Sequence, residues 1–261
     1  MFNNRLSKIC VEKNNRLCLG LDLDNRKLKI NTLSYFKGFI KEIIDTTIDL
    51  CPVYKINFAF YERLGEKGYN ILSEITRHID GRAITIADAK RGDIGNSSKY
   101  YAEAIFDTLN YDSITVSPYM GEDSIKPFCE YDKGVFILCL TSNIGSKNFQ
   151  NKSIDGEKLY LHVAKLASNI NNSNNNIGLV VGATQNSKML KLKEFSKNLP
   201  WLMPGVGFQG GNLEDSIKIG SKNDTTPIIN VSRGILTYKN GTIDDIAEAA
   251  SDYTKQIRKF L

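Results

Sequence analysis

Eight short apolar runs recur along the 261-residue chain at intervals of roughly thirty residues, and this recurrence limits the folds available to it. Most of the runs are continuously apolar rather than alternating, which is typical of parallel strands buried on both faces. The runs are Leu17–Leu21, Val53–Phe58, Ala83–Ala87, Ser113–Ser117, Val135–Leu140, Ile177–Val181, Leu202–Val206 and Ile228–Val231.

Segments with the apolar spacing of helices lie between these runs. The apolar residues of Phe36–Leu50 fall on one stripe, and Ser34 just before it is a typical helix-start residue. Ile71–Ile79 and Ile243–Leu261 also have helical spacing. Alternating strands and helices predict a parallel sheet, and eight such units in about 250 residues is the number in a closed barrel. An open doubly wound sheet is the alternative, but it more usually has five or six strands.

The sequence therefore predicts one α/β domain over residues 1–261, a (β/α)8 TIM barrel with an extra N-terminal helix. The extra helix is expected at Phe2–Asn14, where it would cover the floor of the barrel. The polar segment Asn171–Asn176 falls between a predicted helix and the sixth strand, so we expect a surface loop there rather than a linker.

Composition restricts the class of function. The chain is 41% hydrophobic and 24% charged, and its net charge of +5 comes from dispersed Lys and Arg residues rather than from one basic face. It is therefore not expected to bind nucleic acid, although a modest positive field suits a small anionic substrate. No segment has the length and apolarity of a membrane span, and the N-terminus lacks the apolar core of a signal peptide.

Cysteine and histidine usage points to a reduced compartment and away from zinc. The five Cys are odd in number and no two have CxxC spacing, which favours reduced thiols in a cytoplasmic protein. His78 and His162 are the two histidines, and neither has a neighbour at metal-ligand spacing. We therefore expect a cytoplasmic protein with no metal site.

The third apolar run leads into a cluster of charged residues at Asp88, Lys90 and Asp93. Active sites of α/β barrels lie at the C-terminal ends of the strands, so this is where chemistry is expected. Side chains alternate along a strand, which predicts that Asp88 and Lys90 point the same way, with Asp93 following a Gly-containing turn. Two carboxylates around one ammonium would keep Lys90 protonated, as a proton donor rather than a Schiff-base nucleophile. A salt-bridge network that only closes the strand end is the alternative.

Lys55 lies inside the second apolar run, where a Lys is rare unless it is paired. It could pair with Asp88 or with Asp22, which follows the first run, to give an alternating chain of charges. Asp22 could also accept hydrogen bonds from a sugar hydroxyl. The alternatives are a solvent-facing Lys55 at a strand end and an Asp22 that caps a loop.

Glycine-rich segments follow both of the last two apolar runs, at residues 203–212 and 230–235. Glycine lets the backbone approach an anion closely, and the loops after strands seven and eight commonly bind phosphate in barrels. Arg233, in the second segment, would add a bidentate contact. The two segments therefore predict a phosphate site, although turns use Gly for other reasons too.

Together these residues resemble orotidine 5'-monophosphate decarboxylases, and the resemblance covers essentially the whole chain. Its most specific element is the DxKxxD motif, present as Asp88, Lys90 and Asp93. The sequences Asp-Ala-Lys-Arg-Gly-Asp-Ile-Gly at 88–95 and Thr-Ser-Asn at 141–143 resemble those of the branch usually called type 2. The resemblance implies a cofactor-free, metal-free enzyme of de novo pyrimidine biosynthesis that converts OMP to UMP and CO2.

The resemblance also implies roles for the charged residues. Lys90 would be the general acid that protonates C6 of a vinyl carbanion, and Asp88 would lie beside the departing carboxylate. Asp93 and Ile94 would reach into the neighbouring site of a homodimer, where Asp93 would bind the ribose 2'-hydroxyl. Asp22 and Lys55 would bind the ribose and complete the charge network.

The remaining implied positions would bind the base and the phosphate. Asn57 would line the pocket formed by Asp22 and Lys55. Thr141 and Ser142 would contact the pyrimidine edge, which leaves open which hydroxyl bonds the base. The phosphate would be held by Gln209, Arg233 and Gly234, with the glycine-rich seventh loop as a candidate lid. Pro204 and Ser97 complete the substrate-binding set, and Ser97 stands where the family is expected to have Thr.

Two other functions are compatible with a barrel that carries this motif. Metal-dependent keto-gulonate-phosphate decarboxylases share DxKxxD but place an acidic metal ligand near the position of Lys55, where a Lys would repel a divalent cation. A catalytically silent phosphate-binding barrel is the second alternative, although every member of the charge cluster is present. Activity that requires magnesium would favour the first, and tight binding of a UMP analogue without turnover the second.

Overall fold

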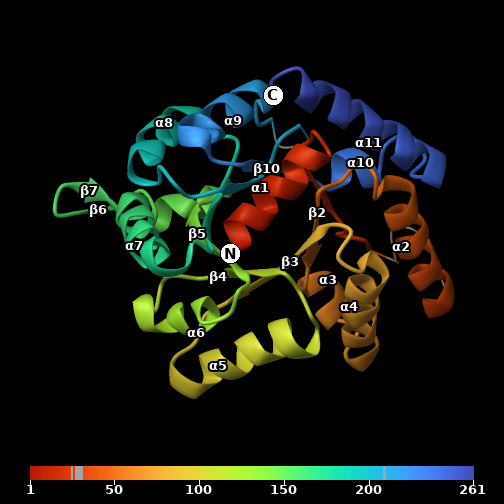
Figure 1. Cartoon of the computed structure of the whole chain (residues 1–261), viewed down its shortest axis with the longest axis horizontal. Helices are drawn as coiled ribbons and strands as arrows, with labels where there is room; N and C mark the ends of the chain where they lie inside the picture. The colour runs from red at the N-terminus through yellow and green to blue at the C-terminus, as the bar shows by residue number, and fades with distance from the viewer. Residues whose placement is uncertain (25, 27–31, 208–209) are drawn as a thin grey trace.

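Eight parallel strands close into a barrel in the computed structural model of the protein, which describes residues 1–24, 26, 32–207 and 210–261. Going round the barrel, the order is β1-β2-β3-β4-β5-β8-β9-β10, and β10 pairs with β1 to close it (Figure 1). The barrel strands are β1 Leu17–Gly20, β2 Val53–Asn57, β3 Ile84–Arg91, β4 Ser113–Val116, β5 Gly134–Leu140, β8 Ile177–Val181, β9 Trp201–Pro204 and β10 Pro227–Val231.

Helices connect the strands and surround the barrel (Figure 1). They are α1 Phe2–Glu12, α2 Leu33–Thr47, α3 Ala59–Glu62, α4 Glu66–Ile79, α5 Gly95–Glu103, α6 Lys126–Cys129, α7 Leu159–Asn174, α8 Asn186–Phe195, α9 Leu213–Gly220, α10 Arg233–Leu236 and α11 Ile243–Arg258. Shorter helical turns lie at Ala104–Thr108, Glu122–Ser124, Ile144–Asn148 and Lys222–Asp224, and a two-stranded hairpin pairs β6 Ser153–Ile154 with β7 Glu157–Lys158. The prediction of a (β/α)8 barrel is confirmed.

The strand and helix boundaries differ from the predicted ones in ways that have local causes. β3 continues to Arg91 rather than ending at Ala87, so it carries the charged motif within the strand. β9 ends at Pro204 rather than at Val206, because Gly205 has a φ of +96° that leaves the extended conformation. The cap of α2 is Thr32, whose side chain accepts a hydrogen bond from the Tyr35 N–H, and not Ser34 as predicted.

The N-terminal helix α1 plugs one end of the barrel, as predicted. Its apolar residues Phe2, Leu6 and Cys10 are buried against side chains of the barrel interior. The ring of Phe2 meets that of Phe136 edge to face, with 6.1 Å between the ring centroids. In Figure 1, α1 lies across the middle of the ring of strands. Burial of this face leaves the opposite end of the barrel for the site.

The prediction of a surface loop at Asn171–Asn176 is wrong. α7 continues to Asn174, and Asn175 ends it in the left-handed conformation with a φ of +45°. Asn176 is 1% exposed, and its amide donates to the backbone carbonyls of Cys129, Tyr131 and Lys133. Asparagine is suited to this joint because it tolerates left-handed φ and can satisfy buried carbonyl groups, which a composition argument does not reveal.

Candidate active site

A cavity of about 330 Å³ opens at the C-terminal ends of the strands. Its volume is in the range of small-ligand sites, and its walls combine apolar side chains with a few converging polar groups. The lining comes from the loop after β1 and from β2, β3, β5, β8, β9 and β10 with the loops that follow them: Asp22, Lys55, Asn57, Asp88, Lys90, Leu138, Thr141, Ser142, Asn143, Val180, Leu202, Pro204, Gly205, Val206, Asn230, Val231, Ser232, Arg233 and Gly234.

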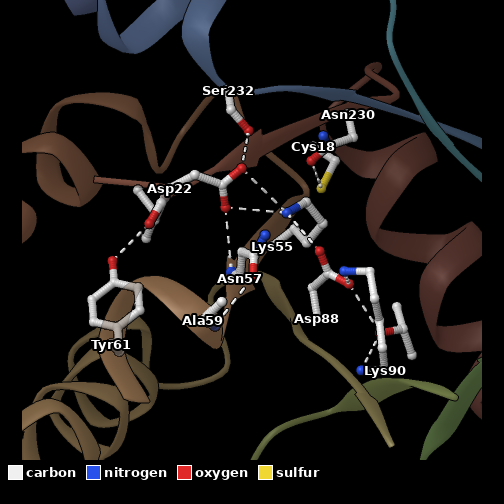
Figure 2. Close-up of polar contacts among 12 residues, drawn as sticks. Cys18, Asp22, Lys55, Asn57, Ala59, Tyr61, Asp88, Lys90, Asn230 and Ser232 are labelled. Carbon is white, nitrogen blue, oxygen red and sulfur yellow. Dashed lines mark hydrogen bonds and ion pairs between the residues drawn. The ribbon is translucent and has the colours of Figure 1, made fainter. Parts of the chain in front are cut away.

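Four charged side chains form a continuous chain across the cavity floor (Figure 2). The ammonium nitrogen of Lys55 lies 3.2 Å from Oδ1 of Asp22 and 3.1 Å from Oδ2 of Asp88. The other carboxylate oxygen of Asp88, Oδ1, accepts a 2.6 Å hydrogen bond from Nζ of Lys90. The predicted alternation Asp22, Lys55, Asp88, Lys90 is therefore confirmed, and Lys55 pairs with both candidate partners.

The pairing decides the charge states of the two buried members. Burial alone would lower the pKa of Lys55, but attraction to Asp22 and Asp88 outweighs it and raises that pKa above its ordinary value. Burial alone would raise the pKa of Asp88, but Lys55 and Lys90 together hold it at about 2. Lys55 is therefore cationic and Asp88 anionic at neutral pH, which makes the floor of the cavity a fixed array of charge.

Lys90 reaches Asp88 by an irregular backbone rather than by the simple alternation that the sequence predicted. Its φ is +50°, and the pairing of β3 with β4 shifts register between Ala87 and Arg91. The bulge turns the Lys90 side chain toward the open mouth, where it is 48% exposed while the Asp88 side chain is 11% exposed. Lys90 is therefore accessible to a ligand, and Asp88 is held beneath it.

Asp93, Ile94 and Ser97 lie outside the cavity of their own chain. The carboxylate of Asp93 accepts a 2.8 Å hydrogen bond from the Ile94 N–H, and within the described ranges no ion pair joins it to Lys90. Within the described part of one chain, Lys90 therefore pairs with the carboxylate of Asp88 alone, not with two carboxylates as predicted. Ile94 is 55% exposed, and Ser97 is exposed on α5.

The other predicted binding residues converge on the cavity, apart from Gln209, which lies outside the described residues. The Thr141 hydroxyl donates to Oδ1 of Asn143 at 2.6 Å and accepts from the Gln150 amide at 2.8 Å. Asn57 is anchored by its backbone N–H, which donates to Oδ1 of Asp22 at 3.3 Å. Ser142, Pro204, Arg233 and Gly234 line the wall.

Two residues that contact the charge chain, and a third that lines the cavity beside it, were not predicted. Ser232 donates a 2.6 Å hydrogen bond to Oδ2 of Asp22, and Thr115 donates one of 3.0 Å to Oδ1 of Asp88. Asn230 lines the cavity and accepts a 3.6 Å hydrogen bond from the Cys18 thiol. Ser232 directly follows β10 and precedes Arg233, whereas Thr115 and Asn230 lie within predicted apolar runs. These positions were the available signal in the sequence.

No metal site and no membrane-spanning helix is present in the described part of the chain. Within it, no three His, Cys, Asp or Glu side chains come close enough together to hold a metal ion. All five cysteines are free and buried. None of the described helices combines the length and the apolarity that crossing a bilayer requires.

Comparison with known proteins identifies relatives over almost the whole chain. The family described as "Orotidine 5'-phosphate decarboxylase / HUMPS family" matches residues 15–243. A curated orotidine 5'-phosphate decarboxylase of Dehalococcoides mccartyi is 47% identical, covering 98% of this chain and 96% of its own length. One of Herpetosiphon aurantiacus is 42% identical, with 96% and 94% covered.

A solved structure of the same family is also similar to this chain. The structure of Leishmania donovani OMP decarboxylase superposes with a TM-score of 0.87 at 36% identity, covering 98% of both chains. The chain therefore belongs to the orotidine 5'-phosphate decarboxylase / HUMPS family.

Proposed function

We propose that this protein decarboxylates orotidine 5'-phosphate to UMP and CO2 in pyrimidine biosynthesis. The observation that carries the proposal is the Lys90 ammonium, hydrogen-bonded to Asp88 at 2.6 Å and exposed to a cavity of nucleotide-binding size. The curated relatives at up to 47% identity are named for this activity, which supports the same assignment.

In the proposed reaction, Lys90 stabilises negative charge at C6 and then neutralises it. The bond between C6 and the carboxylate carbon breaks, CO2 leaves, and the bonding electron pair stays on C6 as a vinyl carbanion. A fixed ammonium lowers the energy of that carbanion, since a preorganised charge stabilises it more strongly than a charge surrounded by mobile water would. Lys90 then donates its proton to C6, and the neutral amine regains a proton from water.

Asp88 acts in this scheme as an anion that positions Lys90. Its pKa of about 2 keeps it ionised, so it accepts hydrogen bonds and does not donate a proton. One of its oxygens holds Lys90 and the other holds Lys55. We assign Asp88 the place beside the departing carboxylate.

The remaining contacts would divide among the three parts of the substrate. Asp22 and Lys55 would bind the ribose with Asn57 lining the same pocket, and Thr141 and Ser142 would contact the pyrimidine. Arg233 and Gly234 would hold the phosphate with Gln209, and Pro204 also lines the cavity as part of the substrate-binding set. Binding energy from a phosphate remote from C6 can position the base for reaction.

We also propose a homodimer in which Asp93 and Ile94 complete the neighbouring site. Within one chain these residues lie outside the cavity, which supports a role across an interface. Large apolar side chains are exposed on the segments that follow β3, β4 and β5, and burial against a second chain would remove them from water. They are Ile94, Tyr100, Tyr101, Tyr119, Met120, Ile144 and Phe149. Ser97 lies on the same segment as Ile94.

The proposed reaction uses no metal, and we place the protein in the cytoplasm. Lys55 occupies the space between Asp22 and Asp88, so a divalent cation there would meet a buried ammonium rather than a third acidic ligand. This argues against the metal-dependent sugar-phosphate decarboxylases as models for the activity. Five free, buried thiols support a reducing compartment.

A spectrophotometric assay tests the proposed function. Loss of the orotidylate absorbance should proceed at the same rate with and without EDTA, and UMP should accumulate in step. Folded protein that binds UMP without consuming orotidylate would contradict the proposal. Magnesium-dependent decarboxylation of a sugar phosphate would contradict it in favour of the metal-dependent relatives.

A further inference from the structure

The bulge in β3 leaves three residues facing a single residue of β4. Ala87 pairs with Ile114 and Arg91 pairs with Val116, so Asp88, Ala89 and Lys90 all lie opposite Thr115. A bulge of this kind interrupts the ladder of backbone hydrogen bonds. The N–H of Lys90 would be without a strand partner unless another acceptor replaced it.

The Thr115 hydroxyl is that acceptor. The Lys90 N–H donates to Oγ1 of Thr115 at 3.0 Å, and the same hydroxyl donates to Oδ1 of Asp88, also at 3.0 Å. The directions are fixed, because an ionised carboxylate can only accept and a backbone N–H can only donate. One hydroxyl, on a side chain that is 1% exposed, therefore ties together the backbone of one charged residue and the side chain of the other.

The contact acts on the two features that make the Lys90 geometry unusual. A φ of +50° is unfavourable for a residue with a side chain, so it must be held by its surroundings. Oδ1 of Asp88 is also the atom that receives the Lys90 ammonium, at 2.6 Å. The Thr115 hydroxyl thus restrains both the Lys90 backbone and the Asp88 carboxylate, and these two groups set where the Lys90 ammonium lies.

We propose that Thr115 is a positioning residue for the proton-transfer step, which it serves by fixing the Lys90 backbone and the Asp88 carboxylate without contacting the substrate. This inference rests on the proposed function, in which Lys90 delivers a proton to C6. A displaced ammonium would still leave the ribose and phosphate contacts intact. The chemical step is therefore affected while binding is retained.

Thr115→Val tests the inference, because it removes the hydroxyl and keeps the volume. Thr115→Ala removes the hydroxyl together with the γ-methyl group, and Thr115→Ser keeps the hydroxyl and removes only the methyl group. We expect Val and Ala to lower kcat about 10- to 100-fold with KM within about 3-fold of wild type, because small misplacement of a reacting group has effects of this size. Thr115→Ser should restore kcat to within about 3-fold of wild type.

Ser113 provides the matched control on the same strand. It is fully buried, and its hydroxyl donates to the backbone carbonyl of Thr85 on β3 at 3.1 Å, away from the charge chain. Ser113→Ala should leave kcat unchanged, as monitored together with thermal unfolding and UMP binding for every variant.

The outcomes separate this inference from the proposed function. Wild-type protein without orotidylate turnover would overturn both. Active wild type with Thr115→Val as fast as Thr115→Ser, or with a loss confined to KM, would overturn the positioning role alone. If Val and Ala are both unfolded while Ser113→Ala is folded, Thr115 serves the fold rather than the reaction, and the inference is wrong.

Discussion

Ser232 donates a 2.6 Å hydrogen bond to Oδ2 of Asp22 and so joins the end of β10 to the end of β1 inside the cavity. The approach depends on Gly20, since a Cβ atom there would lie 1.9 Å from Oγ of Ser232. Ser232 directly precedes Arg233, which we assign to the phosphate, while Asp22 is assigned to the ribose. The hydrogen bond therefore couples two parts of the proposed binding site.

We expect Ser232→Ala to weaken substrate binding more than the chemical step. Asp22 keeps its contacts with Lys55 and the Asn57 N–H, so the lost hydrogen bond should reduce kcat/KM about 10-fold, equivalent to about 1.4 kcal/mol, mainly through KM. Steady-state kinetics measure this split. Ser216→Ala, which removes a hydroxyl that donates to the backbone carbonyl of Asn212 at the start of α9, should change neither constant. An unchanged KM in Ser232→Ala would contradict the coupling.

Lys90→Ala should abolish nearly all decarboxylation while the protein still folds. The variant loses both the charge that stabilises the carbanion and the proton donor, so kcat should fall by at least about 10⁴-fold. Lys90 is half-exposed, and its removal leaves Asp88 paired with Lys55 and Thr115, which should preserve the fold. Thermal unfolding and UMP binding serve as controls, together with Lys8→Ala, which removes an exposed lysine from α1 at the other end of the barrel. Substantial activity in pure Lys90→Ala would remove Lys90 from the mechanism.

Much of this arrangement could be predicted from the sequence because two strong physical constraints act on it. A strand buried on both faces must be apolar throughout, so runs such as Ile177–Val181 located the barrel strands closely. A Lys within such a run needs charged partners, so the sequence alone indicated that Lys55 pairs with Asp22 or Asp88, and it pairs with both.

The remaining features depend on register and on side-chain reach, which the sequence does not encode locally. Regular alternation would not give Lys90 a positive φ, and a bulge in β3 has no signal in the residues 87–91 themselves. Thr115 could have been read as an ordinary strand residue, since its role appears only when three residues of β3 are seen opposite it. Asp93 was expected beside Lys90 because it is near in sequence, but in the structure its carboxylate accepts from the Ile94 N–H and Lys90 pairs with Asp88.

Asp88 should make the folded state sensitive to acid. Its pKa is held at about 2 in the folded protein against about 3.9 when unfolded, so it adds stability above pH 4 that is lost as the pH falls from about 4 through about 2. The shift corresponds to about 2 kcal/mol of unfolding free energy. Urea denaturation of wild type and Asp88→Asn at pH 6 and pH 2 should show the difference between them shrinking by this amount. A difference that is constant with pH would mean that Asp88 is not held ionised by its partners.

Mixing two inactive variants should restore activity if Asp93 acts across the proposed dimer interface. In a mixed dimer of Lys90→Ala and Asp93→Ala chains, one site combines the intact Lys90 of the second chain with the intact Asp93 of the first. The other site carries both defects. Co-expression with two affinity tags isolates this species, and its turnover should exceed that of either parent dimer.

Lys90→Ala mixed with Asp88→Asn is the matched control, because Asp88 and Lys90 contact each other within one chain at 2.6 Å. Every site in that mixed dimer keeps one defect, so no activity should return. Recovery in both mixtures would indicate exchange back to wild-type sites rather than sharing. No recovery in a verified Lys90→Ala and Asp93→Ala dimer, or a monomer by light scattering under assay conditions, would place Asp93 outside the neighbouring site and return it to a structural role at the end of β3.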